Sequence, residues 1–188
     1  DADTLSTLLN KYPKLKLELY TENATQDSVL SYNVIAEIKG KKYPNKYITI
    51  GGHLDSWDVG EGAHDDGAGI VQSIDAIYVF KKIYRPNNTI RIVAFMNEEN
   101  GLMGGKVYAK EAAKKQEKHI TGIESDAGGF TPRYIGTDTT NGLFKLAQSW
   151  NPLFKPYYIE IVKGGGGADI SPLKKIFNIP LCSYEPDL

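Results

Sequence analysis

Two kinds of hydrophobic pattern alternate along this chain. Short runs of apolar, β-branched and aromatic residues predict strands at 15–20, 32–38, 47–50, 89–95, 120–125 and 179–184. The first of these runs reads Leu-Lys-Leu-Glu-Leu-Tyr, and its strict alternation is typical of a half-buried strand. Residues 39–42 (Lys-Gly-Lys-Lys) predict a hairpin turn after the second run, which would add antiparallel strands at one edge of the sheet.

Segments with apolar residues at helical spacing lie between most of these runs. They predict helices at 69–82, 102–115 and 142–150, and a short fourth helix that begins at Asp169. The first helix has one apolar face that we expect to pack on the core, formed by Ile70, Val71, Ile74, Ile77 and Tyr78. Strands that alternate with helices predict an α/β fold, a three-layer αβα sandwich whose mixed, mostly parallel sheet carries helices on both faces.

Composition narrows the class of protein. The chain has 188 residues, 41% hydrophobic and 24% charged, which is ordinary for one soluble globular domain. Its 22 Lys and Arg nearly balance 23 Asp and Glu, for a net charge of -1, which argues against nucleic acid or an anionic membrane surface as partner. No apolar run approaches the roughly 20 residues of a membrane span. The single cysteine excludes an internal disulfide.

The strand at 47–50 leads into Gly-Gly-His53-Leu-Asp55, a His-x-Asp pattern at a strand end. Side chains two apart in a strand lie on the same face, so His53 and Asp55 lie together. His53 could bind a metal through one ring nitrogen while Asp55 holds the other N–H. The alternative is a structural histidine that bonds a neighbouring carboxylate.

Two adjacent carboxylates, Asp65 and Asp66, follow in the loop before the first predicted helix. Their mutual repulsion is costly unless a cation or a helix N-terminus compensates for it. A helix N-cap explains one of the pair, and a cation is the better account of both. His64 is interpreted as a loop residue.

Acidic residues also end the next two strands. Glu98 and Glu99 follow the strand at 89–95, and Asp126 follows the strand at 120–125. A helix first turn and ordinary turn chemistry are the alternatives for these positions. Three successive strands nevertheless deliver a histidine and several carboxylates to one sheet edge, where the ligand sites of open α/β sheets lie. One imidazole with several carboxylates predicts a hard or borderline divalent cation, most often zinc.

Four glycines at 164–167 precede Asp169. They lack the lysine of a phosphate-binding loop. Because glycine lets the backbone approach a ligand closely, we interpret this segment as one wall of a substrate cleft, with Gly165, Gly166 and Asp169 as substrate-binding candidates.

These motifs together resemble the co-catalytic zinc aminopeptidase and carboxypeptidase family. The segments that carry the resemblance are GGHLDSWDVGEGAHDDGAG, the Glu98-Glu99-x-Gly run, IESDAGGF and GGGGADISPL, in this order. The residues of these motifs are most similar to those of the plasma glutamate carboxypeptidase branch, whose members act on short peptides such as dipeptides. The similarity covers nearly the whole chain.

The resemblance implies a two-zinc active site. His53 and Asp126 would bind one zinc, Asp65 would bridge both, and Glu99 would bind the second. The peptide bond between Asp65 and Asp66 is expected to be cis. The implied reaction is hydrolysis of short peptides or dipeptides through a water that bridges the metals.

The resemblance also implies roles around the metals. Glu98 is the implied general base that takes the proton of the bridging water, and Asp55 is the implied partner that orients His53. Gly165, Gly166 and Asp169 belong to the implied loop beside the substrate pocket.

The chain departs from this family in one respect. The second zinc needs a late histidine, whereas the only histidines here are His53, His64 and His119. We therefore interpret residues 1–188 as a single catalytic domain truncated at its C-terminus, with the last ligand beyond Leu188. We expect at most one tightly held Zn²⁺ in this chain and little or no activity. The resemblance further implies a location outside the cytoplasm, secreted or periplasmic, and it leaves a homodimer open.

Two other functions remain open from the sequence. One is a single-zinc acyltransferase of the glutaminyl cyclase type, which is related in fold. The pair Asp65-Asp66 favours the peptidase. The other is a non-catalytic homologue that has lost its metals, against which the presence of every predicted ligand except the late histidine argues.

Overall fold

The computed structural model describes residues 2–24 and 26–187, and these form two units, 1–30 and 31–188. The first unit contains helix α1 (Ala2–Lys11), which has no buried residue. The strand predicted at 15–20 is wrong: this segment has no strand pairing, and Leu17 and Leu19 are 65% and 87% exposed. An alternating pattern forms a strand only where a neighbouring strand supplies hydrogen bonds, and no described strand pairs with this segment.

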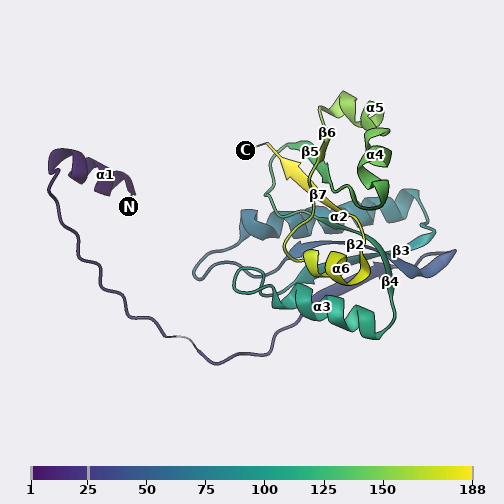
Figure 1. Cartoon of the computed structure of the whole chain (residues 1–188), viewed down its shortest axis with the longest axis horizontal. Coiled ribbons are helices and arrows are strands. Elements are labelled where there is room, and N and C mark those ends of the chain that lie inside the picture. The colour runs from purple at the N-terminus through teal and green to yellow at the C-terminus, as the bar shows by residue number, and fades with distance from the viewer. Residues whose placement is uncertain (1, 25, 188) are drawn as a thin grey trace. The chain divides into compact units, whose positions relative to one another are not determined.

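The second unit is built on a seven-stranded sheet (Figure 1). Its strands are β1 (Val34–Ile38), β2 (Tyr43–His53), β3 (Asn88–Phe95), β4 (Lys118–Glu124), β5 (Pro132–Thr137), β6 (Glu160–Lys163) and β7 (Leu181–Pro186). They lie in the order β1-β3-β2-β4-β7-β5-β6. The four central strands are parallel, whereas β1 and β7 pair antiparallel with β3 and β5. The predicted mixed, mostly parallel sheet is therefore confirmed.

The hairpin predicted around residues 39–42 is wrong. Strand β1 pairs with β3 and not with β2, which follows it in the chain. Residues 41–43 instead bond to the segment just before β3, where the N–H of Lys41 donates to the carbonyl of Pro86 at 3.0 Å. Strands β1 and β2 are thus consecutive in the chain but are separated by β3 in the sheet.

Helices cover both faces of the sheet, α2 on one side and α3 with α6 on the other (Figure 1). The helices of this unit are α2 (Ala68–Ile83), α3 (Met103–Lys114), α4 (Leu143–Gln148), α5 (Asn151–Phe154) and α6 (Ser171–Phe177). Short helical turns lie at Ala63–Gly67, Thr140–Gly142 and Lys155–Tyr157. The main hydrophobic cluster joins Val93 and Phe95 of β3 to α3, α6 and β7. In the part of the chain that the structure describes, no helix is long and apolar enough to cross a membrane.

The apolar face predicted for the first long helix is mostly exposed. Ile70 of α2 is 8% exposed, but Val71, Ile74 and Tyr78 are 65%, 52% and 58% exposed. The buried residues of α2 are Gly69, Ile70 and Ser73. Helix α2 thus approaches the sheet through small residues near its beginning, and no described segment covers the apolar side that the spacing marked.

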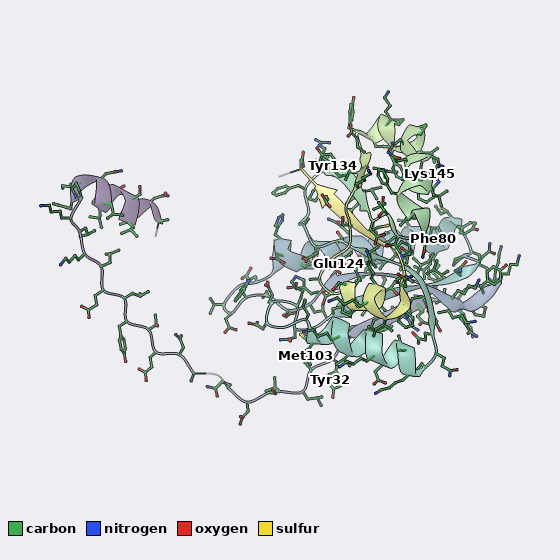
Figure 2. The ribbon with its side chains drawn as sticks, in the orientation of Figure 1. Tyr32, Phe80, Met103, Glu124, Tyr134 and Lys145 are labelled. Atoms are coloured by element: carbon green, nitrogen blue, oxygen red, sulfur yellow. The ribbon has the colours of Figure 1, made fainter. Side chains whose placement is uncertain are left out.

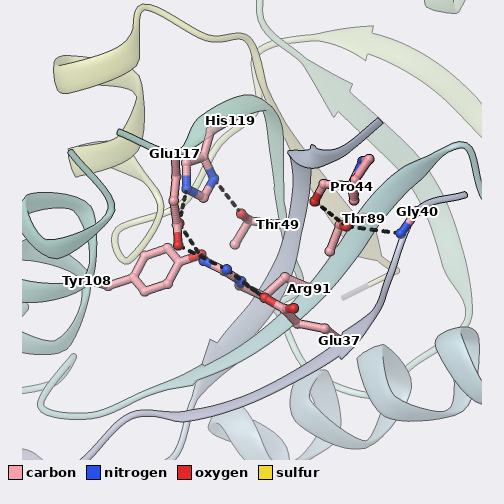
Figure 3. Close-up of polar contacts among 9 residues, drawn as sticks. All are labelled: Glu37, Gly40, Pro44, Thr49, Thr89, Arg91, Tyr108, Glu117 and His119. Atoms are coloured by element: carbon pink, nitrogen blue, oxygen red, sulfur yellow. Dashed lines mark hydrogen bonds and ion pairs between the residues drawn. The ribbon is translucent and has the colours of Figure 1, made fainter. Parts of the chain in front are cut away.

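A polar network ties the α3 face of the sheet together at Arg91 of β3 (Figure 3). Its guanidinium donates to Glu37 of β1 at 2.6 Å, to Glu117 at 2.6 and 3.1 Å, and to the Tyr108 hydroxyl at 3.0 Å. Arg91 is only 7% exposed, so the two carboxylates compensate a buried charge. The network links the edge strand to α3 and to the start of β4.

His119 extends this network at the beginning of β4. Its Nε2 lies 3.2 Å from the Glu117 carboxylate and its Nδ1 lies 3.0 Å from the Thr49 hydroxyl. A neutral ring satisfies both partners when Nε2–H donates to Glu117 and Nδ1 accepts from Thr49. Burial is the main cause that lowers the pKa of His119. This histidine is therefore a structural residue.

Candidate metal and substrate site

The strand order places the predicted ligands together. Strand β2 lies between β3 and β4, and all three are parallel, so their carboxyl ends meet at one edge. The end of β2 supplies His53, the turn after β3 supplies Glu98 and Glu99, and the turn after β4 supplies Asp126. The chain leaves β2 for β3 on one side and later returns to β4 on the other, which makes this edge a topological switch point.

Three side chains at this edge form a group with metal-ligand geometry. His53 Nε2 lies 3.0 Å from an oxygen of Asp65 and 3.2 Å from an oxygen of Asp126. The three ligand atoms all lie within 4.8 Å of one another. One imidazole and two carboxylates are the donor types that zinc takes in proteins, so the residues fit this cation. Among the described residues, Glu99 is not a member of this group.

The other ring nitrogen of His53 is fixed by the backbone. Nδ1 lies 2.8 Å from the carbonyl oxygen of Asp55, an acceptor, so Nδ1 carries a hydrogen and Nε2 is the nitrogen that faces the two carboxylates, where it holds either a proton or a metal ion. The Asp55 carboxylate lies 3.8 Å from Nδ1 and makes no hydrogen bond to it. The Asp55 carbonyl is therefore the group hydrogen-bonded to the ring, and the carboxylate of the same residue, expected to orient His53, lies within ion-pair distance of Nδ1.

The Asp55 carboxylate organises the turn after β3 instead. Its two oxygens accept the backbone N–H groups of Glu98 and Glu99 at 2.9 and 3.2 Å. These bonds hold the Glu98–Glu99 turn beside His53. Burial, followed by the charge of Asp126 and other carboxylates, raises the pKa of Glu98.

Asp66 connects the metal group to helix α2. The peptide bond between Asp65 and Asp66 is cis, as the resemblance implied. The Asp66 carboxylate accepts the backbone N–H of His53 at 3.0 Å and that of Gly69 at 3.1 Å. Burial and the charge of Asp126 raise the pKa of Asp66 to about 7. One of the adjacent carboxylates therefore serves the helix start and the other faces the histidine.

The charges at this edge act strongly on His53, which is 1% exposed. Burial opposes protonation of the ring, but the hydrogen bond to Asp126 and the nearby carboxylates outweigh it and raise the pKa of His53 to about 10. The same carboxylates that favour a proton here favour a divalent cation, because both compensate converging negative charge.

The loop that carries Asp126 is held by Gln72 of α2. The Gln72 amide oxygen accepts the hydroxyl of Ser125 at 2.9 Å, and its nitrogen donates to the carbonyl of Gly128 at 3.2 Å. The Gln72 side chain thus forms hydrogen bonds to the loop on both sides of Asp126. The sequence reasoning did not identify Gln72. The available signal was a polar residue within the apolar stretch that opens the helix.

His64 packs on the same loop from the other side. Its ring lies 4.9 Å from the ring of Phe130, centre to centre. A Cβ at Gly128 would lie 1.9 Å from the His64 ring, and Gly128 has a φ of +90°, so this position requires glycine. His64 lies in the short helical turn Ala63–Gly67 and not in an open loop as expected, and its ring packs against the loop after Asp126.

The glycine loop lines a cavity of about 750 Å³ that also reaches Asp126. Gly165 and Gly166 are among its lining residues, as is Glu124; Figure 2 labels Glu124 and a further lining residue, Tyr134. Asp169 does not line it: its side chain is fully buried, and its two carboxylate oxygens have no hydrogen-bond partner among the described residues. Burial and the charge of Glu124 raise the pKa of Asp169 to about 8.

Comparison with known proteins identifies the class. Residues 33–173 match the sequence model of peptidase family M28. The chain therefore belongs to peptidase family M28, and the resemblance found in its motifs is confirmed.

Individual relatives agree with this assignment. The chain is 33% identical to carboxypeptidase Q of Bos taurus and 34% identical to that of Homo sapiens, in each case over 91% of this chain. It spans 37% of the length of these relatives. The family match favours a peptidase over the acyltransferase alternative.

Solved structures support the fold. The peptidase M28 precursor from Shewanella amazonensis is 37% identical with a TM-score of 0.74, covering 84% of this chain and 36% of that chain. The zinc aminopeptidase BSAP from Bacillus subtilis, 21% identical with a TM-score of 0.63, covers 81% of this chain and 39% of that chain and shows the fold alone. The predicted αβα architecture is confirmed.

Proposed function

We propose that this protein is a zinc-dependent exopeptidase that hydrolyses short peptides or dipeptides. The observation that carries the proposal is the group of His53, Asp65 and Asp126 at the carboxyl edge of a family M28 sheet. The names of its relatives, carboxypeptidase Q and a probable leucine aminopeptidase, support exopeptidase chemistry.

In this proposal His53, Asp65 and Asp126 hold one Zn²⁺, with Asp65 and Glu99 available to a second. Zinc at such a site lowers the pKa of a bound water and polarises a carbonyl oxygen. The chain's own residues set the geometry: the Asp55 carbonyl aims Nε2 of His53, and Asp66 fixes the backbone of His53.

Glu98 is the proposed general base. The Asp55 carboxylate accepts the backbone N–H of Glu98 and so holds this residue in place. Because the pKa of Glu98 is raised, its carboxylate is a stronger base, suited to take a proton from water and return it to the leaving amine. Gly165 and Gly166 form the proposed wall for the substrate. Asp169 supports that wall from behind, in place of the direct contact expected from sequence.

The second zinc is proposed to need a ligand that this chain lacks. His119 lies in the Arg91 network at the beginning of β4, whereas the site lies at the other end of the strand. His64 is not part of the metal-ligand group. We propose that this chain holds at most one zinc tightly, and that the protein acts outside the cytoplasm, as its resemblance implies.

The test uses protein expressed from the complete reading frame that encodes this chain. Dipeptides should be hydrolysed with added Zn²⁺ and not after chelation. Glu98→Gln should lower kcat by about 10² to 10⁴-fold and leave zinc content unchanged. Glu61→Gln, in an exposed loop, is the matched control. Zinc-independent hydrolysis, or near-normal turnover by Glu98→Gln, would contradict the proposal.

A further inference from the structure

The cavity beside the metal-ligand group has a polar wall that the proposed chemistry does not use. Asp126 lines this cavity of about 750 Å³, so a peptide whose scissile bond lies at the group can extend a side chain into it. The volume lies in the range of small-molecule sites and exceeds that of any single side chain.

Strand β7 places a carboxylate in this wall. Ser183 and Glu185 lie two apart on β7, opposite Gly136 and Tyr134 of β5, and therefore share one face. The Ser183 hydroxyl donates to the Glu185 carboxylate at 2.7 Å. A Cβ at Gly136 would lie 2.4 Å from the Ser183 hydroxyl and 3.1 Å from the Glu185 oxygen. The absence of a side chain at Gly136 leaves room for this hydrogen-bonded pair.

The lining is unequally charged. It contains the carboxylates of Glu124, Asp126, Glu185 and Asp187 and only one cationic side chain, Arg133. Arg133 is engaged with Asp187 at 2.9 Å, and Asp126 belongs to the metal-ligand group. Glu185 and Glu124 therefore line the cavity with no cationic partner among the described residues.

Glu124 adds a buried carboxylate to the wall of this cavity. Its side chain is 1% exposed, and one carboxylate oxygen accepts the N–H of Ile170 at 2.9 Å. The other oxygen lies against the glycine loop, 1.9 Å from where a Cβ at Gly167 would be. Burial raises the pKa of Glu124 to about 7, and the backbone N–H groups of Ile170, Asp169 and Ala168 oppose that shift, so this carboxylate is held by the segment before α6 and adds negative charge behind the cavity wall.

We propose that this cavity binds a side chain of the substrate and that Glu185, oriented by Ser183, gives it a preference for basic side chains, lysine or arginine. The aromatic ring of Tyr134 and the glycine loop accommodate the aliphatic stem, while the carboxylate of Glu185 meets the cationic head. The inference rests on the proposed peptidase function, because that function makes the cavity a substrate pocket.

Binding measured without turnover separates the two proposals. N-acetyl-lysinamide and N-acetyl-norleucinamide share a four-carbon side chain, to which only lysine adds an ammonium group, and both lack the free ends that chelate zinc. By NMR titration of the 188-residue chain, the lysine probe should bind about tenfold more tightly, as expected for a charge-assisted hydrogen bond. Glu185→Gln should reduce this ratio to within threefold. Glu160→Gln on exposed β6 should leave it unchanged.

Ser183→Ala provides a second variant that keeps the charge. It should lower the ratio by less than Glu185→Gln, because only the orientation of the carboxylate is lost. Equal binding of the two probes by the wild-type chain would overturn the inference, as would a tenfold ratio that survives Glu185→Gln. Peptide hydrolysis by the complete protein, measured separately with lysyl and norleucyl dipeptides, decides the proposed function.

Discussion

The side-chain amide of Gln72 accepts the hydroxyl of Ser125 at 2.9 Å, one residue before Asp126. The same amide donates to the carbonyl of Gly128, two residues after it. Helix α2 thus determines where the loop presents the Asp126 carboxylate, although Gln72 is not in the metal-ligand group. Groups that orient a ligand in this way commonly affect metal affinity by 10- to 100-fold.

Gln72→Leu should therefore weaken zinc binding by the 188-residue chain by about tenfold. The leucine removes both hydrogen bonds and frees the loop around Asp126. Competition with a chromophoric chelator measures the affinity, and Gln72→Glu, which keeps the acceptor for Ser125, should show a smaller loss. Gln148→Leu on the exposed side of α4 is the matched control, and equal affinities for the two leucine variants would contradict the role of Gln72.

Zinc content tests the ligand set directly. After dialysis, the 188-residue chain should retain at most one zinc, because Asp65 and Glu99 alone offer a second zinc no imidazole. His53→Ala or Asp126→Asn should remove the bound metal, whereas His119→Gln should not. Metal analysis of the dialysed proteins gives the answer, and two zincs per wild-type chain would show that another group replaces the missing histidine.

Arg91 should be important for stability. Its side chain is 9% exposed and compensates the carboxylates of Glu37 and Glu117, so Arg91→Met should lower the free energy of unfolding by about 3–5 kcal/mol. The control is Arg133→Met, which breaks an ion pair exposed by 36% and 42% and should cost less than about 1 kcal/mol. Urea denaturation of both variants measures the difference. Similar losses would mean that the Arg91 network contributes no more than a surface pair.

His119 should make stability depend on pH. Because burial lowers the pKa of His119, the folded protein binds this proton less readily than the unfolded chain, in which histidine has a pKa of about 6.5. The contribution of the neutral ring is therefore fully present above about pH 6.5 and is lost as pH falls below it. Buried carboxylates with raised pKa values, such as Asp66 and Asp169, act in the opposite direction.

A comparison with His119→Gln isolates this effect. The free energy of unfolding of the wild-type chain should exceed that of the variant by more at pH 8 than at pH 5. Thr49→Val, which removes the hydroxyl bonded to Nδ1, should cost about 1 kcal/mol at pH 8. Urea denaturation at the two pH values provides both numbers, and a difference between wild type and His119→Gln that does not change with pH would refute the assignment.

The sequence by itself determined the family, the alternation of strands and helices, and the placement of His53, Glu98, Glu99 and Asp126 at strand ends, with Asp65 in the loop before the first helix. These conclusions follow from local information, because periodicity and strand-end motifs are visible in short windows. The same local information failed where pairing decides. Leu17 and Leu19 alternate like a strand but pair with no described strand, and β1 pairs with β3 across 51 or more intervening residues.

Only the tertiary structure decided how the site is supported. The spacing of His53 and Asp55 suggested a side-chain contact, but the local backbone places the Asp55 carbonyl nearer and sends its carboxylate to the turn of Glu98 and Glu99. Gln72 reaches the Asp126 loop only because α2 crosses beside it, 53 residues away in the chain. Such contacts depend on how elements pack in three dimensions, and no short stretch of sequence contains that information.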